Sequence, residues 1–394
     1  MPKRRRQGCR CNCGGKRRRK HLYVVLDDWD KGFNVHKLDA LSLFDSDSDS
    51  DDDDSGGGLK RLPDPPAVRI TEAQHSPTLF AGIGSCIFVA NKRQYSPETS
   101  GALVYDTETA AMSVGPRLPE IPCCVFVAAA AAAAGGGGKK KKKPKREKEK
   151  TLYTLATINP GDRSQHPSGH LLGVSVHALS APSPAASAEW SWETVPAPLA
   201  PFDGNEENVI AYAVHPDGRT IFLSTRDRTS WHGGGTYSFD TERREWRSHG
   251  DWKLPFTQEG YFERELDAWV GIDDDGYVCA CQVAATDSDG DGATAAPEWM
   301  KTGQKLFRKG DPERYLRATL TYMGNNEFCL VESVIREDVS LRRAYGDGHG
   351  CALHVTVFGL KYSREGELQA TLRRATSSYA VCKYTLFSHV SFWM

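Results

Sequence analysis

A strand–turn–strand unit that recurs along the chain is the feature that most constrains its fold. Residues 235–255 read GTYSFDTERREWRSHGDWKLP, where Tyr237 and Phe239 alternate with polar residues, as the two-residue period of a strand requires. Asp240 and Thr241 then predict a tight turn, because their side chains can bond to nearby backbone amides. The second strand of this predicted hairpin carries Trp246.

Weaker copies of the unit occur elsewhere in the chain. Residues 103–119 place Asp106, Thr107 and Met112 at the same relative positions, and residues 174–198 form a third version around Trp192. Recurrence in units of roughly 50 to 60 residues, once inserts are discounted, is typical of a β-propeller with kelch-sized blades. We therefore expect an all-β, kelch-like propeller of six blades, with five or seven as alternatives.

The same pattern predicts what packs between the blades. We expect alternating apolar residues to supply the blade contacts and three tryptophans to fill the interfaces. The alternating residues are Tyr237, Phe239, Val104 and Phe222, and the tryptophans are Trp192, Trp246 and Trp299. The apolar terminus, residues 384–394, is expected to pair with an early strand and close the ring, which removes free sheet edges.

Two further hairpins are predicted by their turns. Residues 210–224 reverse at His-Pro-Asp-Gly, and residues 268–282 reverse at Asp-Asp-Asp-Gly. His215 beside Asp217 invites a catalytic interpretation, but turn chemistry already accounts for these residue types. Gly82 and Gly84 lack the third glycine and the following helix that a dinucleotide fingerprint needs.

The first twenty residues are basic and contain no acidic residue. Such a composition cannot form a core, so residues 1–20 are expected to be a disordered arm. Its two basic clusters indicate a bipartite nuclear import signal, and alternatively a nucleic-acid-binding tail or a solvated tail without a target. Cys9, Cys11 and Cys13 have one-residue spacers, whereas structural zinc sites use longer ones, so they are expected to be free thiols.

Low-complexity segments interrupt the strand pattern at residues 45–58, 128–150 and 285–297. The first is an Asp/Ser block, the second runs from alanine through glycine to lysine, and the third is rich in Asp and Gly. Each is expected to be a loop insert, and the lysines of the second could serve as another import signal. The rest of the chain is expected to form one propeller domain, residues 21–394, that carries these inserts.

The third insert matches the calcium-loop pattern D-x-[DN]-x-[DN]-G-x5-E. Its matching residues are Asp287, Asp289, Asp291, Gly292 and Glu298. An EF-hand needs a helix on each side of the loop, whereas the preceding residues 277–283 alternate like a strand. The sequence therefore favours an Asp/Gly loop over a calcium site.

Composition excludes several classes of function. The net charge of −1 creates no general attraction for nucleic acid, and no run of about twenty apolar residues predicts a membrane span. Eleven cysteines without a secretory signal indicate reduced thiols in the nucleus or cytoplasm. Of these two compartments, the basic arm favours the nucleus as the location of the protein.

Several longer phrases carry a family resemblance. HLYVVLDDWDKGFNVHKLD, AVHPDGRTIFLS, FERELDAWVG, ATLTYMGNNEFCLVES and VFGLKYSREGEL, with the unit at 235–255, resemble a grass-expanded plant family of uncharacterised proteins with a kelch-like domain of unknown function. The resemblance covers nearly all of residues 21–394 outside the inserts. It brings no catalytic, metal or cofactor residues to carry over, and this chain departs from it in the Asp block and the Ala/Gly/Lys insert.

No nucleophile, metal or cofactor signature stands out from the sequence, so no catalytic, cofactor-binding or metal site is predicted. The leading hypothesis is a non-enzymatic scaffold that binds an unidentified protein partner. One alternative is a nuclear, nucleic-acid-associated factor that acts through its arm, which would also contact an import receptor. The other is a propeller enzyme whose site residues converge only in the fold.

Overall fold

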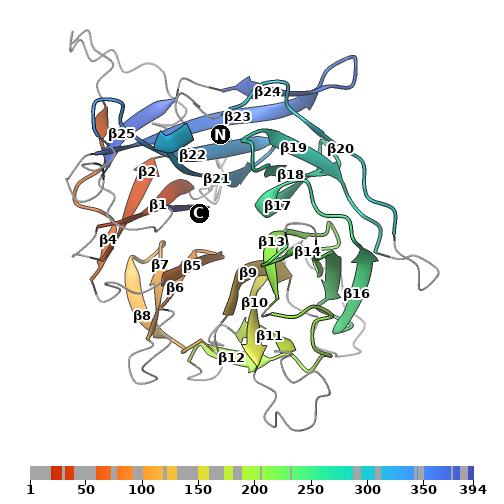
Figure 1. Ribbon diagram of the computed structural model, residues 1–394. Helices are drawn as coiled ribbons and strands as arrows, with labels where there is room; N and C mark the ends of the chain where they lie inside the picture. The colour runs from red at the N-terminus through yellow and green to blue at the C-terminus, as the bar shows by residue number, and fades with distance from the viewer. Residues whose placement is uncertain are drawn as a thin grey trace, which may run out of the picture.

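A computed structural model shows an all-β ring of mainly antiparallel sheets (Figure 1). No helix in the part of the chain that is described is long and apolar enough to cross a membrane. The described residues are 19–28, 32–39, 59–71, 78–91, 101–118, 122–130, 150–158, 173–180, 189–204, 206–230, 233–286, 294–306, 312–340, 344, 350–373, 376–381 and 389–394.

Two sheets are simple four-stranded meanders. In each, the strands follow one another in chain order, as short hairpin connections favour. The first consists of β5 (Thr78–Ile83), β6 (Cys86–Asn91), β7 (Ala102–Asp106) and β8 (Ala111–Gly115). The second consists of β9 (Pro122–Ala130), β10 (Lys150–Ile158), β11 (Gly173–Ser180) and β12 (Ser191–Thr194).

Two further four-stranded units share one eight-stranded sheet. They join where β13 and β17 pair in parallel, while every other pair in the sheet is antiparallel. The first unit is β13 (Glu207–Val214), β14 (Thr220–Asp227), β15 (Thr236–Asp240) and β16 (Glu245–Gly250). The second is β17 (Thr257–Glu263), β18 (Ala268–Ile272), β19 (Val278–Gln282) and β20 (Trp299–Lys301).

The sheet that follows branches at one long strand. The C-terminal half of β23 (Cys351–Tyr362) pairs with β24 (Leu368–Leu372), and its N-terminal half pairs with β25 (Ser377–Val381). The remaining strands are β21 (Tyr315–Gly324), β22 (Glu327–Ile335) and β3 (Lys60–Arg61). A short 3-10 helix, η2 (Pro312–Arg314), precedes β21, and β3 pairs in parallel with β25.

The two ends of the chain meet in one sheet. Its strands are β26 (Val390–Trp393), β1 (His21–Asp27), β2 (Phe33–Asp39) and β4 (Val68–Ile70), in that order. β26 pairs antiparallel with β1, and backbone hydrogen bonds of 2.6 and 3.0 Å join His21 and Met394. The expected closure of the ring by the apolar terminus is confirmed.

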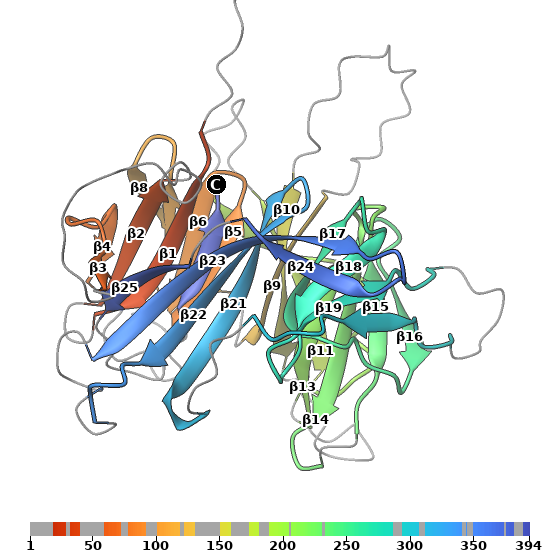
Figure 2. The same cartoon turned by 90° about the horizontal axis from the view of Figure 1, so that it is seen from above.

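These sheets stand side by side around an axis (Figures 1 and 2), and the strands nearest the middle are β26, β5, β9, β13, β17 and β21. The expected β-propeller is therefore the fold of this chain. Because hydrogen bonds merge two of the units into one sheet, the number of six blades stays a prediction, as does the kelch-like character.

Apolar side chains fill the contacts between neighbouring units, as the alternation predicted. Phe239, Tyr237 and Trp246 pack in one cluster with residues of β10 and β11, and Phe222 packs with Trp269 of the next unit, with ring centroids 5.2 Å apart. Trp192 packs edge-on against Phe88 across another contact at 5.6 Å. The burial of each fully buried aromatic side chain contributes about 2–3 kcal/mol to the free energy of unfolding.

The interpretation of Trp299 as an interface residue was wrong. Its side chain is 51% exposed on the outer strand β20. Trp192 and Trp246 also stand on outer strands, but they pack against Phe88 and Phe239. All three residues of the short strand β20 are exposed instead.

The insert expected at residues 128–150 begins later than predicted. β9 continues to Ala130, which pairs with Lys150 at the start of β10. Backbone pairing needs no particular side chain, so the first alanines of the low-complexity run extend the ladder. Residues 131–149, the acidic block and residues 1–18 of the basic arm lie outside the described residues.

Candidate functional site

The His215 turn is built by its aspartate. Asp217 Oδ1 accepts hydrogen bonds from the backbone amides of Arg219 (2.8 Å) and Thr220 (2.9 Å), and Oδ2 accepts one from the Thr220 hydroxyl (2.7 Å). Burial raises the pKa of Asp217, but these hydrogen bonds outweigh it and the pKa is lowered. Gly218 takes the positive φ of 78° that the turn requires. The contacts are those of the expected turn.

The two Asp-Thr copies make matching contacts. The Oδ1 atoms of Asp106 and Asp240 each accept the amide two residues on, at 2.9 Å in both copies. The hydroxyls of Thr107 and Thr241 each donate to a carbonyl of the preceding turn, at 2.7 and 2.9 Å. Because both copies make the same hydrogen bonds, these residues belong to the repeated frame and not to a unique site.

The calcium-like loop cannot be placed in the fold. Asp287, Asp289, Asp291 and Gly292 lie outside the described residues. Its last member, Glu298, accepts a 3.3 Å hydrogen bond from the side chain of Gln282. Among the described residues, no group of three His, Cys, Asp or Glu side chains has the arrangement of a metal site.

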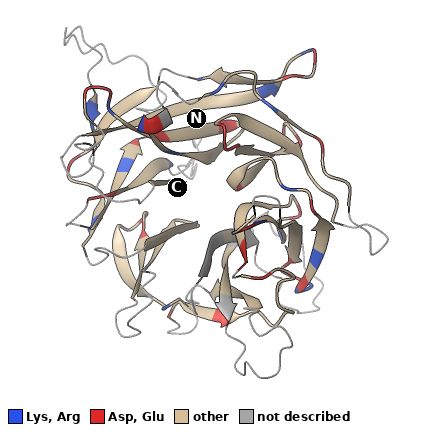
Figure 3. Ribbon diagram, viewed as in Figure 1, with Lys and Arg blue, Asp and Glu red and all other residues tan. Residues whose placement is uncertain are grey.

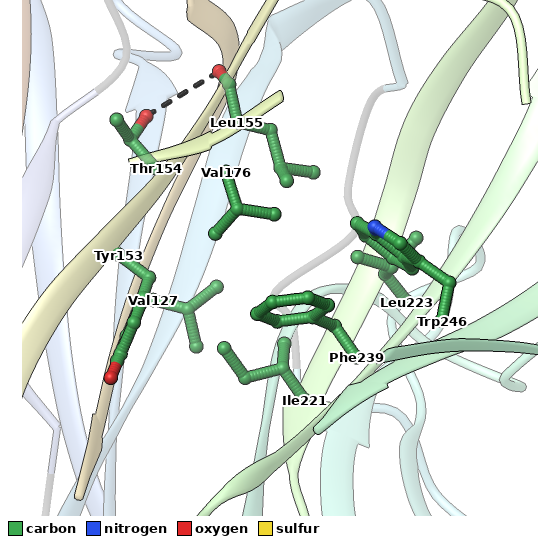
Figure 4. Close-up of a pocket in the computed structure, with 9 residues that line it drawn as sticks. All are labelled: Val127, Tyr153, Thr154, Leu155, Val176, Ile221, Leu223, Phe239 and Trp246. Carbon is green, nitrogen blue, oxygen red and sulfur yellow. Dashed lines mark hydrogen bonds between the residues drawn. The ribbon is translucent and has the colours of Figure 1, made fainter. Parts of the chain in front are cut away.

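A small cavity lies between the units β9–β12 and β13–β16 (Figure 4). Its volume of about 10 Å³ is room for about one water molecule. Its walls are mainly apolar and come from Val127, Tyr153, Thr154, Leu155, Val176, Ile221, Leu223, Phe239 and Trp246. A void of this size and polarity is a packing gap, too small for a substrate.

Polar residues of three successive inner strands meet near the middle of the ring. We name Tyr212 of β13, Glu259 and Tyr261 of β17, and Arg317 of β21 the central cluster. Tyr212 lies opposite Glu259 in the parallel β13–β17 ladder. The Tyr261 hydroxyl lies 3.0 Å from Glu259 Oε2 and 3.1 Å from the Leu320 carbonyl oxygen. Each of the four residues is half-buried.

Burial and neighbouring charges shift the pKa values of side chains in the central cluster. Burial is the main cause that raises the pKa of Tyr212 well above its usual value; the charge of Glu259 raises it further and Arg317 opposes this. Burial and then Glu259 likewise raise the pKa of Tyr261. Burial lowers the pKa of Arg317. Both tyrosines therefore stay protonated and act as hydrogen-bond donors over the physiological range.

Two residues extend the central cluster along β21 and β22. Burial, followed by the charge of Glu332, raises the pKa of Tyr315 to about 12. Glu332 is buried and pairs in register with Ala318 of β21. The neighbourhood thus combines tyrosine hydroxyls and a guanidinium with carboxylates, which is a mixture of hydrogen-bond donors and acceptors.

Exposed apolar side chains lie on outer strands, far from the central cluster. All three residues of β20 are exposed, with Trp299 at 51% and Met300 at 39%. On β8, Val114 is 80% exposed and Met112 39%. Both strands end their sheets, so each offers an edge to which another strand can add. Charged residues of both signs are interspersed around the ring (Figure 3).

A family model described as protein of unknown function (DUF1668) matches residues 19–379. The chain belongs to this family. A search of curated proteins finds no match. The distribution of the family among plants stays a prediction.

Solved structures of similar fold are distant in sequence. TolB from Acinetobacter baumannii has a TM-score of 0.40 and 8% identity, over 95% of this chain and 66% of that chain. A nidogen/laminin complex has a TM-score of 0.40 and 6% identity, over 93% and 100%. A xylan beta-1,4-xylosidase from Bacillus halodurans C-125 has a TM-score of 0.32 and 11% identity, over 77% and 57%. This chain thus spans less than two thirds of the TolB and xylosidase chains.

Sequence reasoning missed the central cluster, since its members come from three strands that are spread over residues 212–317. The local signal is a single tyrosine between alanines in IAYAV and a glutamate beside a glycine in EGYFE. Such polar residues in short strands usually indicate a solvent-facing side. The parallel pairing of β13 with β17, which brings the cluster together, has no sequence signature.

Proposed function

We propose that this protein is a non-enzymatic scaffold that binds a protein partner through an outer edge of its propeller. The observation that carries the proposal is β20, where Trp299 and Met300 are exposed on the last strand of an eight-stranded sheet. Tryptophan is strongly enriched at the energetic centres of protein interfaces. An edge strand adds backbone hydrogen-bonding groups that an extended partner segment can pair with.

The surroundings of β20 fit a binding surface that keeps its shape. Lys301 lies 3.8 Å from Asp273 and 4.3 Å from the ring centre of Tyr277. The Thr302 amide donates a 2.9 Å hydrogen bond to the Val278 carbonyl oxygen, so the backbone beyond the strand is also held. A partner would meet a preformed apolar surface and lose little free energy in ordering it.

The test is partner capture that depends on the edge. The full chain and a Trp299→Ser, Met300→Ser double variant are used as bait, and each captured protein is purified and titrated against both. We expect at least one partner whose affinity falls at least tenfold in the double variant, which corresponds to about 1.4 kcal/mol. A Tyr362→Ser variant, which changes an aromatic residue 40% exposed on another strand, is the matched control. Partners that bind both baits equally would contradict the proposal.

An enzymatic function is the second candidate, and the central cluster is the observation that favours it. A carboxylate next to two tyrosines whose pKa is raised by burial resembles an acid–base arrangement. Turnover in a broad hydrolase and oxidoreductase screen that is lost in Glu259→Gln would establish it. Turnover that persists in that variant would exclude the central cluster as its source.

A further inference from the structure

The outer strand β8 differs from the outer strands at which the other sheets end. Each of those strands carries at least one charged residue, which disfavours nonspecific pairing with another strand. The charged residues include Arg69 on β4, Glu193 on β12, Glu245 on β16, Lys301 on β20 and Lys60 on β3. The sequence of β8 is AMSVG, without a charge, and all but the last of its five residues are exposed.

Two apolar side chains alternate on one face of β8. Val114 is 80% exposed and Met112 39%, and in the ladder they lie opposite Leu103 and Tyr105 of β7. Residues that lie opposite each other in antiparallel strands turn their side chains to the same face of the sheet. These four residues therefore form one apolar stripe that ends at the open edge of the sheet β5-β6-β7-β8.

A two-fold axis at Ser113 would pair β8 with β8 of a second copy of the chain. In this antiparallel register Met112 lies opposite Val114 of the second copy, so each exposed apolar side chain meets another on the same sheet face. The contact is isologous, because one surface is complementary to itself, and the closed pair leaves no edge of β8 for a third copy. Pro116 follows the end of β8 and has no N–H group to donate, which limits the ladder to β8 itself.

Charged residues just outside β8 favour the antiparallel arrangement. Glu108 lies in the turn before β8 and Arg117 follows the strand, and both are exposed. In an antiparallel pair the turn end of one strand lies beside the far end of the other, so Glu108 of each copy comes to the same end as Arg117 of the other copy. A parallel pair would bring like charges together. Such complementary charges mainly fix the orientation of two partners.

We infer that β8 is a self-association edge, through which two copies of this chain form a symmetric dimer and join their four-stranded sheets into one. A ladder of five residues gives a small interface, below about 1,200 Å², so the dimer is weak and depends on concentration. The inference is independent of the proposed scaffold function, because it uses β8 and not the outer edge at β20.

The test is sedimentation equilibrium of the full chain at concentrations up to about 200 µM, a range that covers micromolar dissociation constants. The average mass should rise from that of one chain toward that of two. Val114→Lys places an ammonium group against Met112 of the other copy and should weaken dimerisation at least tenfold. Leu372→Lys is the matched control, since it adds the same charge at an exposed leucine of β24, which is also an uncharged strand. This control and the Trp299→Ser, Met300→Ser double variant should leave the dissociation constant unchanged.

Cysteine cross-linking tests the register. Ser113 would face Ser113 of the second copy on the axis, so Ser113→Cys should form an intermolecular disulfide under mild oxidation, above the level of the unsubstituted chain. Ala111 would lie opposite Gly115, so Ala111→Cys should cross-link clearly less. Urea unfolding shows whether each variant folds, and Met112→Lys provides a second disruption if Val114→Lys does not.

Several results would overturn the inference. One is a chain that stays monomeric at every concentration, and another is a dimer that the folded lysine variant at β8 does not weaken. Equal cross-linking of the two cysteine variants would contradict the register. A dimer that is lost in the double variant at β20 would belong to that edge and would leave β8 without this role.

Discussion

Removal of the last strand should open the ring and destabilise the whole propeller. Deletion of residues 390–394 takes away β26, the first strand of the sheet β26-β1-β2-β4. Four half-buried apolar side chains leave with it: Val390, Phe392, Trp393 and Met394. At about half of the 1.5–3 kcal/mol that full burial of such a side chain contributes, their loss amounts to about 3–6 kcal/mol.

Hydrogen bonds add to this loss. The ladder between β26 and β1 disappears, and Thr319 and Thr321 lose their contacts at 3.2 and 2.5 Å with the Ser391 hydroxyl. Each hydrogen bond contributes about 1 kcal/mol. The total approaches the free energy of unfolding of a typical domain, which is about 5–15 kcal/mol. The deletion also leaves β1 with an unpaired edge that carries buried apolar residues, a site for aggregation.

The assay is urea unfolding followed by tryptophan fluorescence, together with light scattering on a sizing column. The truncated chain should aggregate or unfold at a much lower urea concentration, and a peptide of residues 389–394 added in trans should partly restore the transition. Ser391→Ala, which keeps the strand, should cost only about 1–2 kcal/mol. A monomeric truncated chain that unfolds cooperatively at the original midpoint would refute the closure argument.

Three further predictions concern other parts of the chain. Burial lowers the pKa of His249 from 6.5 to about 4, so the unfolded state binds more protons than the folded state between these pH values. The free energy of unfolding should therefore fall by about 3 kcal/mol in total as the pH drops through this range. The urea midpoint of His249→Gln should depend less on pH, and an unchanged pH dependence would contradict this. Asn326→Ala removes side-chain hydrogen bonds of 2.6 and 3.2 Å to the backbone of Leu360 and should lower the free energy of unfolding by about 2–3 kcal/mol. Asn325 is exposed and has a similar positive φ, so Asn325→Ala should lower it clearly less in the same assay. Deletion of residues 1–20 should abolish nuclear accumulation of a fluorescent fusion, and nucleic-acid binding through this arm should weaken steeply with salt; binding that does not depend on salt would argue against the arm.

The hairpins of this fold were predictable because their causes are local. The turn at Asp217 is specified by side chains within three residues, and the Asp240 turn repeats the contacts of the Asp106 turn. Alternation placed Phe222 and Phe239 in blade contacts for the same reason, since a two-residue period fixes which face a side chain occupies. Ring closure was also predictable, because an apolar terminus must be buried.

Tertiary structure decided the rest. The sequence pattern of Trp299 is that of an interface tryptophan, yet its side chain is exposed, because burial depends on whether side chains of a neighbouring blade reach it, as Phe88 reaches Trp192. The central cluster depends on the parallel pairing of β13 with β17, and on register shifts that no local pattern encodes. By itself the sequence determined the strands, their turns and the closed all-β frame, whose causes lie within a few residues. The meeting of Tyr212, Glu259 and Arg317 required the ring, since only its geometry brings three separate inner strands to one place.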